Sequence, residues 1–148
     1  MLDEKDMEIL RALKENSKSS VNKLAKLTGI PPATVHHRLK KLEKDGVIQR
    51  YTIDTNDKKL GYSLHAYISI TVQPRGKGDM DQRKLADKLA KHELVLDAAV
   101  LAGDVDMLLK MRAKDMDQLN NFILDYLRNI EGIDKTKTLM VMHSAGGA

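Results

Sequence analysis

The sequence predicts a two-domain α+β protein in which three helices precede a sheet domain of β-α-β-β-α-β order. Three observations lead to this fold class. The first 50 of the 148 residues carry apolar side chains at helical spacing, and the remainder alternates strand-like with helix-like segments. Residues 1 to 60 hold 13 Lys and Arg against 9 Asp and Glu, whereas residues 61 to 148 hold 12 of each. The excess positive charge therefore belongs to the helical part, which indicates an anionic partner for that domain.

Capping and breaking residues delimit three helices in the first part of the chain. Asp3 and Asp6 have the spacing of an N-cap and a third helical residue, and Ser20 is placed to cap a second helix that ends at Gly29. A third helix begins at Pro32, because proline can start a helix but cannot continue one. The apolar residues expected to face a shared core are Ile9, Leu10, Leu13, Val21, Leu24, Ala25, Leu27, Val35, Leu39 and Leu42.

A linker is expected after the third helix. Residues 47 to 53 are rich in β-branched side chains, which predicts a strand or short hairpin, and the polar residues 54 to 59 follow. We therefore divide the chain into a helical domain at residues 1 to 50, a linker at 51 to 62 and a sheet domain at 63 to 148.

The sheet domain opens on a strand of clear two-residue period, residues 64 to 73. The segments expected after it are a loop at 74 to 78, a helix at 85 to 92, strands at 95 to 102 and 106 to 113, a helix at 116 to 130 and a strand at 136 to 142. This order builds one sheet with two helices on one face, the ferredoxin-like arrangement.

Composition excludes several classes of protein. With 42% hydrophobic residues the chain can bury enough surface to fold, and no run of about 18 apolar residues offers a membrane span. The charged N-terminus lacks the apolar stretch of a secretory signal, so we expect a cytoplasmic protein without a membrane partner. The absence of cysteine excludes disulfides, thiolate nucleophiles and cysteine-ligated zinc.

Ala25, Gly29 and Val35 have the spacing of a helix-turn-helix unit of the winged-helix-like kind. A small residue lets two helices cross closely, and glycine takes the left-handed turn between them. The third helix then presents a basic outer face that fits duplex DNA, with its start at base edges in the major groove and its later residues at phosphates. The residues expected at base edges are Pro32, Ala33, Thr34, His36 and His37, and those expected at phosphates are Arg38, Lys40, Lys41 and Lys44.

Two plainer interpretations of this helix stay open. A three-helix unit can also be a bundle that binds another protein, and a run of charge can be an ordinary solvated face. A metal site is not expected here, because the adjacent His36 and His37 point about 100° apart on a helix and form a poor chelating pair.

Six short segments carry a resemblance that covers nearly the whole chain. They are Asp6-Met7-Glu8-Ile9-Leu10, Leu24-Ala25 with Gly29-Ile30, the recognition segment from Val35 to Glu43, Asp45-Gly46-Val47-Ile48, Lys59-Leu60-Gly61 and Ala102-Gly103-Asp104-Val105-Asp106. In these segments the sequence resembles the Lrp/AsnC (feast/famine) family of bacterial and archaeal transcription regulators. Two positions depart from the family pattern: Pro31 stands where a capping serine is frequent, and Val105 where an aromatic residue is common.

The resemblance implies a sequence-specific DNA-binding regulator without cofactor, whose second domain pairs sheet against sheet into homodimers that often assemble into octamers. It also implies an amino-acid effector bound between dimers. A two-fold dimer predicts a pseudo-palindromic operator in double-stranded DNA.

The turn from Gly103 to Asp106 is a candidate reader of a zwitterion. The carboxylates of Asp104 and Asp106 can hold an ammonium group, and turn amides can receive a carboxylate. Thr136 and Thr138, which point the same way on the last strand, add hydroxyl groups to this effector set. An ordinary hairpin turn is the alternative, because Gly and Asp favour turns for backbone reasons alone.

Other classes of function compete with the regulator. RNA-binding modules share the βαββαβ order, but they stack bases on aromatic residues of the central strands, and residues 107 to 111 contain none. An enzyme needs a convergent polar site, and the sequence shows no such set, so no catalytic residue is expected. An effector-independent, architectural DNA-binding protein is the remaining alternative.

Overall fold

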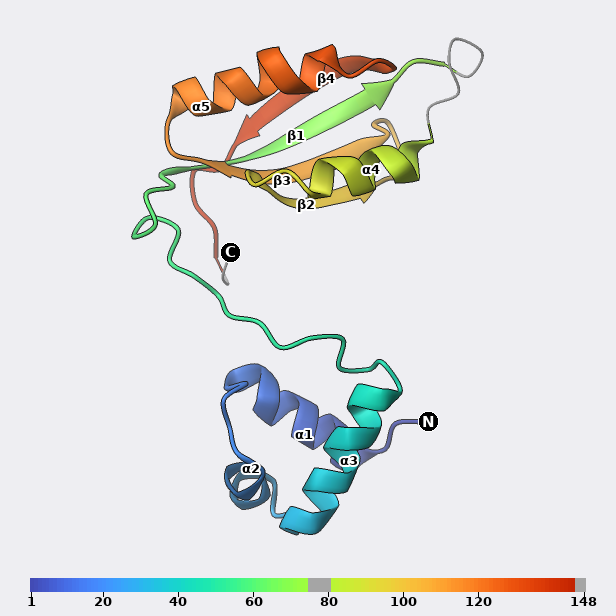
Figure 1. The fold of residues 1–148 in the computed structure, drawn as a ribbon, viewed down its shortest axis with the longest axis vertical. Coiled ribbons are helices and arrows are strands. Elements are labelled where there is room, and N and C mark those ends of the chain that lie inside the picture. Colours follow the sequence, from blue (N-terminus) through green and yellow to red (C-terminus); the bar gives the residue numbers. More distant parts are fainter. Residues whose placement is uncertain (75–80, 146–148) are drawn as a thin grey trace. The chain divides into compact units, whose positions relative to one another are not determined.

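The computed structural model describes residues 1–74 and 81–145, and its chain divides into two compact units, residues 1–53 and 54–148 (Figure 1). Each unit has its own cluster of buried apolar side chains. Residues 75–78 of the predicted loop lie outside the described residues.

The first unit consists of three helices, α1 (Glu4–Glu15), α2 (Val21–Thr28) and α3 (Pro32–Lys44). Asp3 caps α1 and forms the predicted reciprocal pair with Asp6, while the Ser20 hydroxyl accepts from the third backbone amide of α2. The buried cluster draws on all three helices and comprises Ile9, Leu13, Leu24, Ile30, Val35 and Leu42. Leu27 was expected in this core, but its side chain is 61% exposed because it lies at the edge of the short inward face of α2.

The strand predicted at residues 47 to 53 does not form. The amides of Val47 and Ile48 instead donate to the carbonyl of Leu42 and close the end of α3. Beyond them, Ile53 is 75% exposed, and the Tyr51 hydroxyl donates to an exposed carboxylate of α3. The β-branched composition was a misleading signal here, because a strand needs a neighbouring strand to pair with, and no strand within residues 1–74 and 81–145 pairs with this segment.

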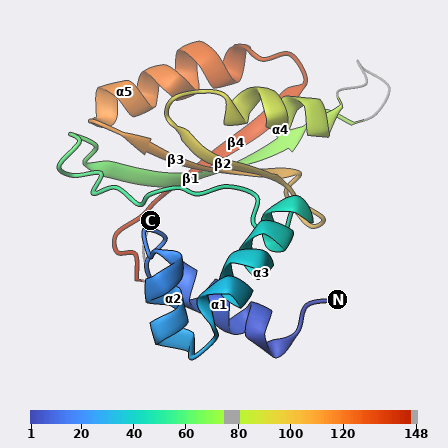
Figure 2. The same ribbon diagram turned by 60° about the horizontal axis from the view of Figure 1, so that its bottom comes forward.

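The second unit is a four-stranded antiparallel sheet of order β2-β3-β1-β4. Its elements are β1 (Leu64–Val72), α4 (Gln82–Ala90), β2 (Val95–Val100), β3 (Met107–Ala113), α5 (Met116–Asn121), η1 (Phe122–Tyr126), η2 (Leu127–Asn129) and β4 (Ile133–Met140). The helices of this unit cover the same face of the sheet (Figures 1 and 2), and within the described residues no helix of the unit lies on the opposite face. This is the predicted ferredoxin-like arrangement, with the last strand beginning three residues earlier than expected.

The last helix differs from the continuous α-helix predicted for residues 116 to 130. After Asn121 the backbone widens into one π-helical segment, η1, and then tightens into the 3₁₀ turn η2. Phe122 and Leu127, five residues apart, are both buried, which a π turn permits because it brings residues i and i+5 to one side. The His92 ring packs against Phe122 and Tyr126 of this segment, with ring centroids 4.8 Å apart in each case.

Within the described residues, no helix combines the length and the apolar character that crossing a membrane requires.

Candidate nucleic-acid interface and effector turn

The turn between α2 and α3 has the geometry that the spacing predicted. Gly29 adopts φ 70°, a left-handed conformation, and its amide donates to the Ala25 carbonyl at 2.9 Å. A side chain at this position would meet no atom within 4 Å, so glycine is required by the backbone angle rather than by lack of space. Ile30 follows as a buried residue of the core and anchors the turn.

Helix α3 separates an apolar inner side from a polar outer side. Val35 and Leu42 are 0% and 3% exposed and fix the helix against α1 and α2. The residues expected to meet DNA occupy the other side: Pro32, Ala33, His36, His37, Lys40, Lys41 and Lys44 are exposed, and Thr34 is half-buried. Among the lysines, Lys40 lies 3.9 Å from the Glu43 carboxylate. The helix can therefore present donors and positive charge to an anionic groove.

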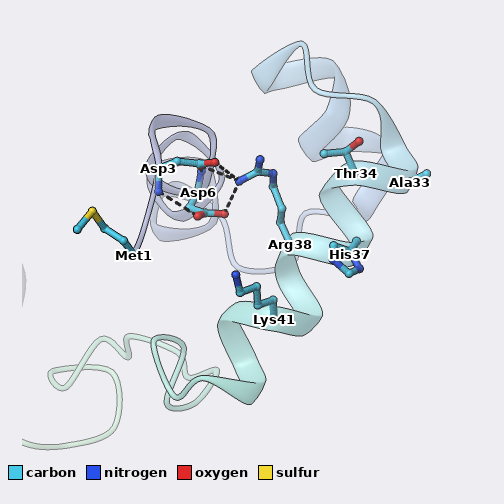
Figure 3. A pocket seen from close by; sticks show the side chains of 8 residues that line it. All are labelled: Met1, Asp3, Asp6, Ala33, Thr34, His37, Arg38 and Lys41. Carbon is cyan, nitrogen blue, oxygen red and sulfur yellow. Dashed lines mark hydrogen bonds and ion pairs between the residues drawn. The ribbon is translucent and has the colours of Figure 1, made fainter.

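Arg38 differs from the other residues of this set, because the structure gives it protein partners. Its guanidinium reaches from α3 to the start of α1, where Nη1 donates to the carboxylates of Asp3 and Asp6 at 2.6 and 2.9 Å (Figure 3). The hydrogen bonds from Arg38 and from the Asp6 amide lower the pKa of Asp3 to about 2. The ion pair therefore stabilises the folded unit fully only above about pH 5, and this stabilisation is lost as the pH falls through about 2. Arg38 thus ties α3 to the start of α1.

A hollow of about 490 Å³ lies beside this ion-pair cluster, between the start of α1 and the outer side of α3. It is lined by Met1, Asp3, Asp6, Ala33, Thr34, His37, Arg38 and Lys41. The carboxylates of Asp3 and Asp6 offset the positive charge of Arg38 (Figure 3). Of the lysines of α3, Lys40 lies near Glu43, and Lys41 and Lys44 are exposed. No local sequence pattern marks this pairing, because Arg38 lies 35 and 32 residues from Asp3 and Asp6.

The predicted effector residues differ in exposure and in hydrogen bonding, and they fall into three groups. Gly103 and Asp104 are exposed in the connection between β2 and β3. Asp106 is half-buried, and its Oδ2 accepts from the Val72 amide at 2.8 Å, so this carboxylate already has a structural task. Thr136 and Thr138 pair with Ile70 and Ile68 and therefore lie on the helix-covered face, with Thr136 at the same end of the sheet as the turn.

No group of three or more His, Asp or Glu residues within residues 1–74 and 81–145 is arranged to hold a metal ion.

Each of the two units matches a known family of protein domains. A sequence model of a winged helix-turn-helix DNA-binding domain matches residues 2–49, and one of the Lrp/AsnC ligand-binding domain matches residues 65–145. The chain is 37% identical over 140 residues to an uncharacterised HTH-type transcriptional regulator of Pyrococcus abyssi, covering 95% of this chain and 92% of that protein. It is also 37% identical to the HTH-type transcriptional regulator FL11 of the same organism over 141 residues, covering 95% and 89% of the two chains.

Solved structures give the same result. A transcriptional regulator of Neisseria meningitidis, crystallised as a complex with L-Met, superimposes with a TM-score of 0.89 at 26% identity, covering 99% of this chain and 93% of that one. The AsnC protein of E. coli superimposes with a TM-score of 0.84 at 28% identity, covering 97% and 94%.

Proposed function

Because the chain belongs to the Lrp/AsnC family and is a DNA-binding transcription regulator, we propose that it acts as a homodimer on pseudo-palindromic operators through the outer side of α3. The observation that carries this proposal is the division of α3, in which Val35 and Leu42 are held in the core while the lysines and histidines stay exposed. Phosphate contacts by the lysines supply affinity, and contacts by the first turn of α3 supply sequence preference.

The face of the sheet that lies opposite its helices supports the homodimer. Within the described residues, no helix of the sheet unit covers the side of β1 and β3 that carries Tyr67, Ser69, Leu108 and Lys110. A face that packs against the same face of a second copy generates a two-fold dimer, and two α3 helices related by the two-fold axis would read two inverted half-sites. The proposal extends to octamers of four such dimers, which analytical ultracentrifugation distinguishes from free dimers.

Selection of preferred sequences from random duplexes tests the operator proposal. We expect the selected sequences to contain an inverted repeat whose half-site centres lie about one helical turn, or a multiple of it, apart. A single asymmetric half-site would contradict the dimeric mode of binding. The selection is run with and without mixed amino acids, and a change in the selected set or in affinity would reveal an effector.

We also propose that the effector is an amino acid bound at the turn between β2 and β3. The Neisseria regulator that was crystallised with L-Met supports this class of ligand. Asp104 is the carboxylate free to bind an ammonium group, since Asp106 is engaged by the backbone of β1.

Asp104→Ala is expected to weaken amino-acid binding about tenfold, because it removes one charge-assisted hydrogen bond. Isothermal titration calorimetry with each amino acid measures this change. Asp87→Ala, an exposed aspartate of α4, is the matched control and should bind as the wild type does. If no amino acid binds the wild-type protein, the turn is an ordinary hairpin connection and the effector-independent mode is favoured.

A further inference from the structure

The linker contains a buried carboxylate that neither DNA binding nor effector binding uses. Asp57 is 7% exposed and is the one polar or charged residue that the structure buries this fully within the part of the chain it describes. Its Oδ2 is 2.8 Å from His65 Nε2, and its Oδ1 accepts from Arg112 Nη1 at 2.5 Å. We call Asp57, His65 and Arg112 the linker latch.

The linker latch joins the linker to two strands at once. His65 of β1 and Arg112 of β3 are directly opposite each other in the sheet register, so both side chains lie on the face opposite the helices, where they meet Asp57. The Arg112 guanidinium also lies 4.2 Å from the centre of the Tyr62 ring. Burial alone would raise the pKa of Asp57, but the hydrogen bonds from His65 and Arg112 outweigh it and lower the pKa. The carboxylate is therefore charged at neutral pH and holds both partners.

The backbone around Asp57 is folded into a turn that depends on this anchor. The amides of Leu60 and Tyr62 donate to the Asp57 carbonyl at 3.0 and 2.9 Å. Ser63 then begins the sheet region, where its hydroxyl donates to the carbonyl of Lys114. A carboxylate that is bonded to the sheet therefore fixes a complete turn of the linker, rather than one side chain.

The linker latch sets the length of the free tether between the units. Residues 49 to 55 make no backbone hydrogen bond to any described residue, and the chain becomes fixed again at the turn that starts with Asn56 and Asp57. At about 3.5 Å per residue, residues 49 to 56 span at most about 28 Å. If the linker latch opened, the tether would run to Tyr62 and reach about 49 Å.

We propose that Asp57 is a specificity-determining residue, which limits the half-site spacing that one dimer can bridge by shortening each tether. This inference rests on the proposed binding of two half-sites by a dimer. Moving the half-sites apart by one helical turn, about 34 Å, requires about 17 Å more from each subunit. The closed linker latch withholds about 21 Å of reach from each subunit, which is more than the additional reach that the longer spacing requires.

The test compares affinities of the full-length protein for two duplexes that share the same half-sites. One duplex has the spacing recovered by selection, and the other has one additional helical turn. Wild-type protein should lose on the order of 100-fold on the longer duplex, because only one unit of the dimer then binds. Asp57→Asn, which removes the charge and keeps the size, should lose about tenfold or less. Asp57→Glu, which restores the carboxylate, should move the ratio back toward the wild-type value.

Asp54→Asn is the matched control, because Asp54 lies in the same linker and is exposed. It should keep the wild-type ratio. Hydrogen exchange of the Leu60 and Tyr62 amides reports on the linker latch without DNA, and both amides should exchange faster in Asp57→Asn. Should that variant not fold, His65→Gln, which removes one of the two anchoring partners, is measured in its place.

The outcomes separate the two proposals. Faster amide exchange with an unchanged ratio of affinities would overturn the role of Asp57 in specificity, while DNA binding itself stands. Wild-type protein that binds both duplexes equally would overturn it as well. If wild-type protein binds neither duplex at low salt, the proposed operator binding fails first.

Discussion

Raising the salt concentration from 50 to 200 mM is expected to weaken DNA binding by the dimer about 1,000-fold. Lys40, Lys41 and Lys44 are exposed on the outer side of α3 in each subunit. If each meets one phosphate, a dimer neutralises about six phosphates and releases their counterions, which gives a log-log slope of about −5. Fluorescence anisotropy with a labelled operator, repeated across this range of salt, measures the slope. An affinity that does not change with salt would contradict phosphate binding by α3.

Single substitutions measure how much each residue of α3 contributes to the salt dependence of DNA affinity. Lys41→Ala should flatten the slope by about one unit for each bound subunit. Arg38→Ala should flatten it much less, because the Arg38 guanidinium is already paired with Asp3 and Asp6. Equal changes for the two variants would mean that Arg38 leaves its carboxylate partners when DNA binds.

Leu24→Ala is expected to unfold the helical unit and abolish DNA binding while the sheet unit stays folded. The Leu24 side chain is 0% exposed within a cluster of six buried residues. Truncating a buried leucine costs about 2 to 5 kcal/mol, which is most of the stability that a unit of this size can have. Because the sheet unit has a separate core, we expect its melting transition to be unchanged.

Leu27→Ala is the matched control for this prediction. It makes the same chemical change three residues later on α2, at a side chain that is 61% exposed. We expect it to change the melting temperature of the helical unit by little and to keep DNA binding. Differential scanning calorimetry with parallel anisotropy measurements checks both variants. Unfolding of the two units in a single transition in Leu24→Ala would show that their stabilities are coupled.

Features that depend on nearby residues were predictable from the sequence. The capping pair Asp3 and Asp6 and the left-handed Gly29 follow from spacings of three and four residues, and the structure confirms them. The exposed outer side of α3 follows from helical periodicity in the same way. These features fix the helix-turn-helix unit, which explains why the family and its DNA-binding function could be recognised.

Features that depend on distant partners were not predictable. Arg38 meets Asp3 across 35 residues, and Arg112 meets Asp57 across 55 residues, so no local pattern marks either pair. The prediction of a strand at residues 47 to 53 was wrong for a related reason. The β-propensity of a segment gives its preference for an extended backbone, but it does not show whether another strand is there to pair with it. Leu27 was misassigned because an eight-residue helix has a narrow inward face.

The π-helical segment η1 bears on how chains of this fold can vary in length. A π turn holds one residue more than an α turn, and π turns are uncommon outside sites under special constraint. Removing one residue from Phe122–Tyr126 would let the backbone relax into α geometry while the preceding α5 and the following η2 kept their packing. A homologue that is one residue shorter in this stretch should therefore carry an uninterrupted α-helix over the same sheet.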